Sequence, residues 1–230
     1  MNEPLFRLEG VRFAYEPNRP VLEEANFVVG RAERVAILGA NGSGKTTLLH
    51  LMVGLLKPTA GTVSAFGRPR RTERDFHEVR ARAGLLFQDP DDQLFCPTVL
   101  EDVAFGPLNL GKKPREAKML AEATLARLGL RGLGPRITHH LSGGEKRLVT
   151  LATVLAMQPE VLLLDEPTVG LDEAAQARLT ALLQARAEGM VIVSHDREFR
   201  ERLATRVVTL RGGKIECDGA GPATAPLPKE

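Results

Sequence analysis

The feature that most constrains the fold of this chain is a glycine-rich segment, Gly39–Thr46, which follows the apolar run Arg34–Leu38 and precedes residues with helical periodicity. The segment fits the phosphate-binding pattern G-x-x-x-x-G-K-[ST]. Glycines let the backbone curl so that successive N–H groups point at an anion, and the positive end of the next helix adds to the attraction. We expect Lys45 to reach the β- and γ-phosphates and the Thr46 hydroxyl to ligate Mg²⁺. The alternative is a glycine-rich turn without a ligand.

Periodicity along the rest of the chain alternates between strand and helix at both ends, with a mainly helical stretch in the middle. Strands are expected at 5–13, 21–29, 34–38, 62–66, 83–87, 161–164 and 191–194, with a hairpin at 206–216. Helices are expected at 46–55, 115–128, 142–157 and 172–187. These patterns predict an α/β nucleotide-binding core with a helical subdomain inserted at about 89–157, one domain over 1–218, and a loose tail at 219–230.

The amino-acid composition indicates which kinds of partner and which cell compartment to expect for this chain. With 31 basic and 29 acidic residues, the net charge of +2 gives no support for a nucleic-acid partner. The two cysteines, Cys96 and Cys217, do not make a disulfide framework. The longest apolar runs have the length of strands, and the first residues do not read as a signal peptide. We therefore expect a cytosolic chain that reaches a membrane only by docking on a partner.

Two acidic residues follow the apolar run 161–164, which is typical of a buried parallel strand. Ligands of open α/β sheets bind at the carboxyl ends of the strands, where Asp165 and Glu166 are placed. Asp165 is suited to hold Mg²⁺, and Glu166 is suited to orient or deprotonate an attacking water. The alternative is a pair of acids that only ends a strand in solvent.

A second helix start that could bind an anion lies at Ser142-Gly143-Gly144-Glu145. Ser142 can cap the helix, and the two glycines allow an anion to approach closely. Because one nucleotide does not need two such helix starts from the same chain, we infer that Ser142 binds the γ-phosphate held by another subunit. An ordinary capped helix after a flexible turn is the alternative.

Together these segments resemble the ATP-binding subunit of an ABC transporter over residues 5 to about 218. The matching motifs are Walker A (Gly39–Thr46), the Q-loop glutamine (Gln88), the signature (Leu141–Glu145), Walker B with its glutamate (Asp165, Glu166), the D-loop (Val169–Asp172), the switch histidine (His195) and the adenine-stacking aromatic residue (Tyr15). The resemblance implies a P-loop NTPase core, with a mixed, largely parallel sheet and flanking helices, an N-terminal antiparallel β subdomain and the inserted helical subdomain.

The resemblance also implies roles for individual residues. The nucleotide contacts would be Tyr15, Asn41, Gly42, Ser43, Gly44, Lys45, Thr46 and Thr47, with Ser142, Gly143 and Gly144 acting on the ATP of the other subunit. The catalytic residues would be Lys45, Gln88, Glu166 and His195. The Mg²⁺ contacts would be Thr46, Gln88 and Asp165.

The segment after the Q-loop, Gln88–Pro107, closely resembles that of energy-coupling-factor transporters, which include cobalt and nickel importers. In that group the segment faces coupling helices of the membrane component, and Asp89, Asp91 and Asp92 are expected to form a groove for a basic helix. A solvated acidic loop is the alternative. The implied protein is an ATPase on the cytoplasmic face of the membrane that powers import of cobalt, nickel or a vitamin.

The implied partners are a second ATPase subunit (a copy or a close paralogue), a transmembrane coupling component and a substrate-capture membrane subunit, without nucleic acid. The other classes considered are a soluble ABC-type ATPase acting on ribosomes or DNA and a non-hydrolysing nucleotide-gated scaffold. One departure from the family pattern is Glu145, where Gln is commoner. Its carboxylate would repel a triphosphate unless it points outward or pairs with a base such as Arg147.

Overall fold

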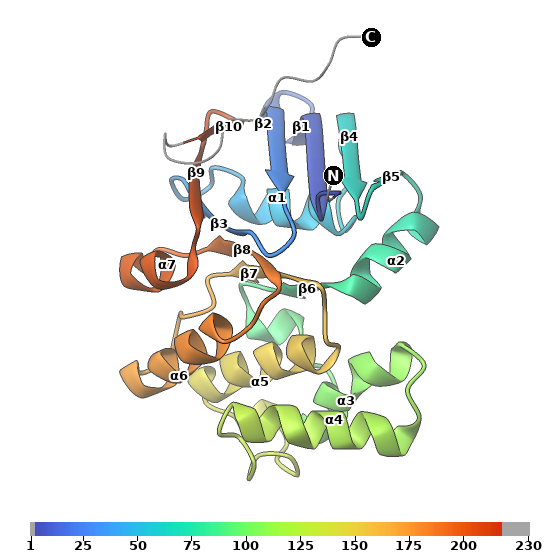
Figure 1. Cartoon of the computed structure of the whole chain (residues 1–230), viewed down its shortest axis with the longest axis vertical. Coiled ribbons are helices and arrows are strands. Elements are labelled where there is room, and N and C mark those ends of the chain that lie inside the picture. Colours follow the sequence, from blue (N-terminus) through green and yellow to red (C-terminus); the bar gives the residue numbers. More distant parts are fainter. Residues whose placement is uncertain (1–2, 218–230) are drawn as a thin grey trace.

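A computed structural model describes residues 3–217, and strand pairing within this range gives two sheets (Figure 1). The strands are β1 (Phe6–Glu16), β2 (Arg19–Val29), β3 (Arg34–Leu38), β4 (Ala60–Ala65), β5 (Arg68–Arg70), β6 (Ala83–Leu86), β7 (Val161–Asp165), β8 (Gly189–Val193), β9 (Arg206–Arg211) and β10 (Lys214–Cys217). A four-stranded antiparallel sheet has the order β2-β1-β4-β5, and a six-stranded sheet has the order β10-β9-β3-β8-β7-β6. This arrangement is the P-loop NTPase type of fold expected from the sequence.

The helices occupy separate layers around these sheets. They are α1 (Lys45–Met52), α2 (Glu73–Arg82), α3 (Val99–Asn109), α4 (Pro114–Arg127), α5 (Gly143–Ala156), α6 (Glu173–Gln184) and α7 (Arg197–Leu203), with 3-10 turns at Pro90–Asp92 and Thr138–His140. Figure 1 shows α1 between the two sheets, and α5 and α6 below the six-stranded sheet, with α3 and α4 beyond them. The chain between β6 and β7 consists of helices and loops.

Alternation along β7 explains why the six-stranded sheet is covered on both faces. Val161 and Leu163 belong to the core shared with α1 and the antiparallel sheet, whereas Leu162 and Leu164 belong to the core shared with α3 to α7. All four side chains are fully buried. A continuous apolar run is therefore required here, since each strand residue faces one of two cores.

The imperfect alternation of β1 has a local cause. Phe6 and Leu8 face the core, and the pairing with β2 then shifts before Val11. Gly10 adopts a φ of +56° at this irregularity, and its N–H donates to Asn26 Oδ1 at 2.8 Å. The irregular residue moves the following core residue by one position, which breaks a strict period of two.

Several elements differ from the sequence expectations. The helix expected at 172–187 ends at Gln184, and the helix expected to reach 55 ends at Met52. Helix α2 was not predicted, because Phe76 and Val79 are its only buried residues. Its capping box, in which Thr72 and Asp75 satisfy each other's backbone N–H groups, was the available signal. Among residues 3–217, no helix has both the length and the apolarity needed to cross a lipid bilayer.

Gly54 caps the C-terminus of α1, the helix that follows the glycine-rich loop. The N–H of Gly54 donates to Leu51 O at 3.2 Å and that of Leu55 to His50 O at 2.9 Å, the pair of bonds of a Schellman cap. Gly54 has a φ of +72°, and a Cβ atom there would lie 2.1 Å from the ring of Phe76 on α2. Both the backbone and the packing therefore require glycine.

We predict that Gly54→Ala destabilises the fold more than Gly111→Ala. Gly111 closes α3 with the same cap at a φ of +85°, but no heavy atom lies within 4 Å of its Cβ position. The left-handed backbone alone should lower the free energy of unfolding by about 1–2 kcal/mol. The clash with Phe76 should add about 1–3 kcal/mol. Denaturant unfolding of both variants measures the difference, and equal losses would contradict the packing argument.

Candidate functional site

The glycine-rich loop joins β3 to α1 and brings the first N–H groups of α1 close to the ammonium of Lys45. Gly44, the residue before α1, has a φ of +102° and offers no side chain to the first N–H groups of the helix. The ammonium of Lys45 lies across the loop, where it donates to the carbonyls of Gly39 at 2.8 Å and Ala40 at 2.9 Å. A helix start with free N–H groups beside an ammonium is suited to bind a phosphate.

Asp165 lies beside this loop because it ends β7 at the same sheet edge. Its Oδ2 accepts a hydrogen bond of 2.6 Å from the hydroxyl of Thr46. Burial raises the pKa of the Asp165 carboxyl, while the Thr46 hydrogen bond and the nearby His50, Arg147 and Lys45 act in the opposite direction. A hydroxyl and a carboxylate side by side are the oxygen donors that Mg²⁺ takes together with substrate phosphates.

Glu166 has the most constrained geometry in the site. Its φ is +48°, which is uncommon for a residue with a side chain. Its N–H donates to Val193 O at 2.8 Å, and its Oε2 accepts the N–H of His195 at 3.1 Å. Its Oε1 is buried, has no hydrogen-bond partner and lies 3.4 Å from His195 Nε2. A held carboxylate with one free oxygen can accept a proton or orient a water.

These groups share one cavity of about 690 Å³. The predicted residues that line it are Tyr15, Asn41, Gly42, Gly44, Lys45, Thr46, Thr47, Gln88, Asp165, Glu166 and His195. Val21, Val169 and Val193 also line it. Sequence reasoning gave no site role to Val21 or Val193, because an apolar residue that lines a site has the same pattern as one in a core.

Ser43 and Tyr15 are placed differently from each other. The Ser43 hydroxyl is buried without a partner and lies 2.5 Å from where a Cβ of residue 39 would stand, so it faces the inside of the loop and does not line the cavity. Tyr15 is 63% exposed, and its ring packs edge-on against the ring of Phe13, with ring centroids 4.9 Å apart. The hydroxyls of Tyr15 and Thr47 are 3.1 Å apart, which places the ring at the rim of the cavity.

The other predicted anion site lies outside this cavity. Ser142 caps α5, and neither it nor Gly143 or Gly144 lines the cavity. No heavy atom lies within 4 Å of a Cβ position on Gly143, and a Cβ on Gly144 would lie 3.0 Å from the carbonyl of Gly170. Gly143 thus leaves the helix start open, while Gly144 lies against the loop after β7.

Glu145 pairs with a base, but the base is not Arg147. Its Oε2 accepts the N–H of Ser142 at 2.8 Å and the hydroxyl at 2.9 Å, and its Oε1 pairs with Arg136 at 3.1 Å. These contacts, led by the backbone N–H of Ser142, lower the pKa of Glu145. Pairing with Arg147 was the wrong expectation, because residues two apart on a helix do not face each other. Arg147 is buried instead.

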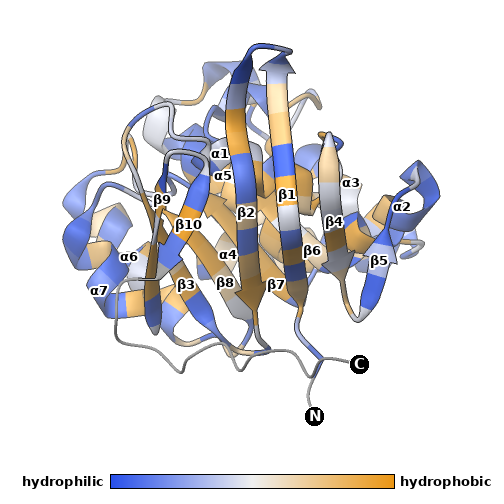
Figure 2. Cartoon of the chain, turned by 90° about the horizontal axis from the view of Figure 1, so that it is seen from above, coloured by the Kyte–Doolittle hydropathy of each residue, from blue (hydrophilic) through white to orange (hydrophobic). Residues whose placement is uncertain are grey.

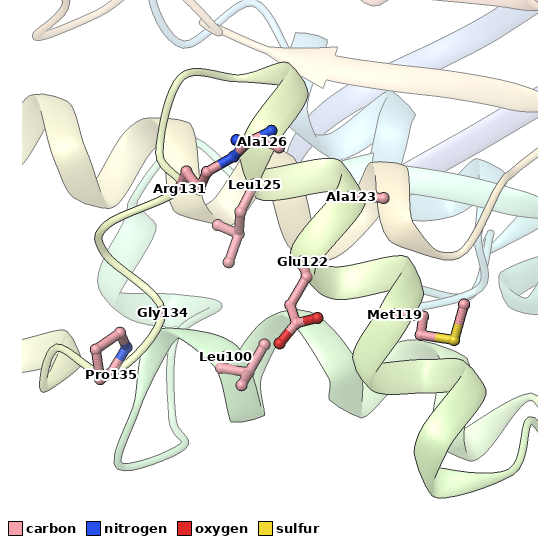
Figure 3. A pocket seen from close by; sticks show the side chains of 9 residues that line it. All are labelled: Leu100, Met119, Glu122, Ala123, Leu125, Ala126, Arg131, Gly134 and Pro135. Atoms are coloured by element: carbon pink, nitrogen blue, oxygen red, sulfur yellow. The ribbon is translucent and has the colours of Figure 1, made fainter.

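A second hollow lies among the helices between β6 and β7 (Figure 3). It holds about 560 Å³ between α4, Leu100 of α3 and the loop after α4. Apolar side chains such as Met119 and Leu125 dominate its lining, with Glu122 and Arg131 at its sides. None of the predicted site residues lines it.

Comparison with known proteins assigns this chain to a family. The sequence model of the ABC transporter family matches residues 22–169. A Brucella suis protein is 55% identical over 93% of this chain and 88% of its own length. Its provisional name, ABC transporter ATP-binding protein, states no cargo. The cobalt import ATP-binding protein CbiO of Rhodobacter capsulatus is 45% identical over 96% of this chain and 80% of its own length.

A solved structure with the same fold bears on the reaction. It is the dimeric, post-hydrolysis state of the ATP-binding cassette MJ0796 with ADP and Pi bound, and it matches with a TM-score of 0.85 and 26% identity. The match covers 92% of this chain and 96% of that chain. The chain described here therefore belongs to the ABC transporter family, as an ATP-binding subunit that hydrolyses ATP.

Proposed function

We propose that this chain powers an importer of the energy-coupling-factor type, with a metal ion such as cobalt or nickel, or a vitamin, as the cargo. The observation that carries the ATPase part is the shared cavity in which Lys45, Thr46, Asp165 and Glu166 meet. Similarity to a cobalt import ATP-binding protein supports the importer part. The chain would work on the cytoplasmic face of a membrane, held there by a transmembrane coupling component and a substrate-capture subunit.

In this proposal ATP and Mg²⁺ occupy the 690 Å³ cavity. The loop N–H groups and Lys45 bind the phosphates, and Tyr15 stacks on the adenine. Thr46, Asp165 and Gln88 hold Mg²⁺, which neutralises charge on the phosphates. Glu166 orients the attacking water through its free Oε1, and His195 holds the other carboxylate oxygen through its N–H and contacts the γ-phosphate.

The exposed start of α5 supports a second subunit as partner. Ser142, Gly143 and Gly144 lie outside the cavity of their own chain, with an open approach at Gly143. In a head-to-tail pair, which a copy or a close paralogue would complete, they would bind the γ-phosphate held by the partner. Arg136 offsets the charge of Glu145 at 3.1 Å, and in this role the Ser142 hydroxyl, which donates to Glu145 at 2.9 Å, turns to the phosphate.

A groove beside Gln88 supports docking of the membrane component. It is lined by Leu55, Phe95 and Phe105, with other apolar residues beneath them. Phe95 and Phe105 are 62% and 41% exposed, and their ring centroids are 4.7 Å apart. Exposed aromatic residues gathered in one groove are typical of contact surfaces. We propose that an apolar face of a cytoplasmic helix of the coupling component fills it.

The acids that were expected to form a groove for a basic helix, Asp89, Asp91 and Asp92, lie outside this apolar groove. Asp91 pairs with Lys146 at 2.6 Å, and the side chain of Asp89 accepts the N–H of Asp91 at 2.9 Å. Neither they nor Asp92 lines the groove. The one carboxylate there, Asp102, is buried and accepts the N–H groups of Phe95 and Cys96 at 3.2 and 3.0 Å. Its role is to hold the loop that carries Phe95, so the partner is recognised by apolar contact.

The proposed nucleotide contacts predict that one variant loses ATP binding and another loses ATP hydrolysis. Lys45→Ala should weaken ATP binding by about 10–100-fold, because it removes charge-assisted hydrogen bonds. Glu166→Gln should bind ATP normally but hydrolyse it about 10²–10⁴-fold more slowly, because it removes the base. On size exclusion with Mg-ATP, Glu166→Gln should run as a persistent dimer. The exposed Glu198→Gln serves as the control. Hydrolysis by Lys45→Ala at the wild-type rate would exclude the loop from the mechanism.

The groove proposal predicts a loss of assembly without a loss of chemistry. The double variant Phe95→Ser/Phe105→Ser should no longer co-purify with co-expressed membrane components, while ATP binding by the isolated chain stays unchanged. Met119→Ser, at a 60% exposed residue on α4, is the matched control and should assemble normally. Assembly of the double variant at the wild-type level would show that the groove is not the docking surface.

The cargo proposal predicts what the assembled transporter carries. Elemental analysis and mass spectrometry of the co-purified membrane complex should detect bound cobalt, nickel or a vitamin. ATP-dependent uptake of that cargo into vesicles should stop when the complex contains Glu166→Gln. Uptake of a cargo of another class would overturn the cargo assignment and leave the ATPase assignment standing.

A further inference from the structure

Arg147, on the second turn of α5, is a buried cation whose hydrogen bonds all go to the backbone. Its side chain is 2% exposed and is the largest of the fully buried side chains among the described residues. Nη1 donates to Phe87 O at 2.6 Å, and Nη2 donates to Asp165 O at 3.0 Å and to Glu166 O. Within residues 3–217, no carboxylate oxygen lies within 4.0 Å of a nitrogen of this guanidinium, so Arg147 forms no ion pair there. Its Nε has no hydrogen-bond partner in the same range.

The three carbonyls belong to the catalytic edge of the sheet. Phe87 follows β6 and precedes Gln88. Asp165 ends β7, which pairs with β6 in parallel, and Glu166 follows it. One guanidinium therefore joins the ends of two neighbouring strands where both enter the site. A rigid planar fork of donors can hold several acceptors in a fixed geometry, which a flexible ammonium does less well.

A role in packing alone does not account for an arginine at this position. Burying a cation without a carboxylate partner is unfavourable, and an apolar side chain of similar volume is often as stable or more stable. Burial lowers the pKa of the Arg147 guanidinium, while the nearby carboxylates of Asp165, Glu166 and Asp89 act in the opposite direction and favour its charged form. The charge thus stays next to the site at a cost in desolvation.

Glu166 is the residue that needs this support. Its φ of +48° is strained, and contacts from several parts of the chain hold it, including a long turn bond of 3.3 Å from the N–H of Val169 to its carbonyl. The carbonyl of Val193 accepts its N–H, the N–H of His195 reaches its carboxylate, and Arg147 fixes its carbonyl. If the Arg147 contact is lost, only the long bond from Val169 still holds this carbonyl, so the peptide after Glu166 can rotate and carry the carboxylate away from the water that it orients.

We propose that Arg147 is a positioning residue for ATP hydrolysis in its own subunit, where it holds the backbone of Glu166 and the start of the Gln88 loop in the geometry that hydrolysis requires. The proposal rests on the ATPase site described above. It assigns Arg147 no contact with ATP, so its loss affects turnover while ATP binding and ATP-driven pairing persist. A displacement of about 1 Å in a catalytic group can lower the rate about 100-fold.

Arg147→Met and Arg147→Lys test this role beside the control Lys146→Met on the same helix. We expect Arg147→Met to bind ATP with an affinity within about threefold of the wild type, to form the Mg-ATP dimer on size exclusion, and to lose about 100-fold in kcat. Arg147→Lys keeps the charge and some donors, so its kcat should lie between the two. A wild-type kcat in Arg147→Met would overturn the proposal. Joint loss of ATP binding, pairing and thermal stability in both Arg147 variants would also overturn it, because that result indicates a general structural role.

Mixed dimers locate the effect. When Arg147→Met is paired with a Glu166→Gln subunit, the only competent glutamate lies beside the substituted arginine, and hydrolysis should be lost. When both substitutions are in one subunit and the other is wild type, the rate should match that of a dimer with Glu166→Gln alone in one subunit. Equal loss in both arrangements would contradict action within one subunit. Failure of the wild-type chain itself to bind and hydrolyse ATP would instead overturn the proposed function.

Discussion

The parallel alignment of β3, β8 and β7 is the constraint on which the site depends. Because parallel strands end at the same edge, the loop after β3, Asp165 at the end of β7 and His195 after β8 meet there. The 2.6 Å contact between Thr46 and Asp165 joins residues 119 positions apart in sequence. A shift of one residue in β7 would exchange the side chains that face the two cores and would turn the Asp165 carboxylate away from Thr46.

The same sheet separates the two helices whose starts are suited to anions. Helix α1 packs in the core on one face, and α5 packs in the core on the other. Figure 1 shows the six-stranded sheet between α1 and α5, and Figure 2 shows the hydrophobic colouring of its inner strands, such as β7 and β8. The start of α1 faces the cavity, while Ser142, Gly143 and Gly144 lie outside it. This separation is the physical reason to propose that two subunits complete each nucleotide site.

Two residues at the catalytic edge of the sheet, Glu166 and Arg147, have features that lower the stability of the folded chain. Glu166 combines a positive φ, which costs about 1–3 kcal/mol, with a buried oxygen that has no partner. Arg147 adds a buried cation. Neither feature helps the fold by itself, and each is held by rigid neighbours on β7, β8 and α5. Such a site is prepared before the substrate arrives, because its dipoles do not have to reorganise during the reaction.

The sequence by itself determined the phosphate-binding loop, the acidic pair after β7, the capped helix at Ser142 and the alternation of strands and helices. Each of these depends on neighbours along the chain: a glycine pattern, an apolar run that ends in acids, or a side chain that caps its own helix. Helix α2 escaped prediction because only two of its side chains are buried, and periodicity needs more members than that.

Only the tertiary structure decided which distant residues meet. It paired Glu145 with Arg136 and Asp91 with Lys146, and it placed Arg147 under the ends of β6 and β7. In the sequence Arg147 is one more basic residue on an amphipathic helix, and its burial follows from how α5 packs beneath the sheet. Local patterns report backbone preference and burial, whereas the partner of a charged side chain depends on the packing of elements far apart in the chain.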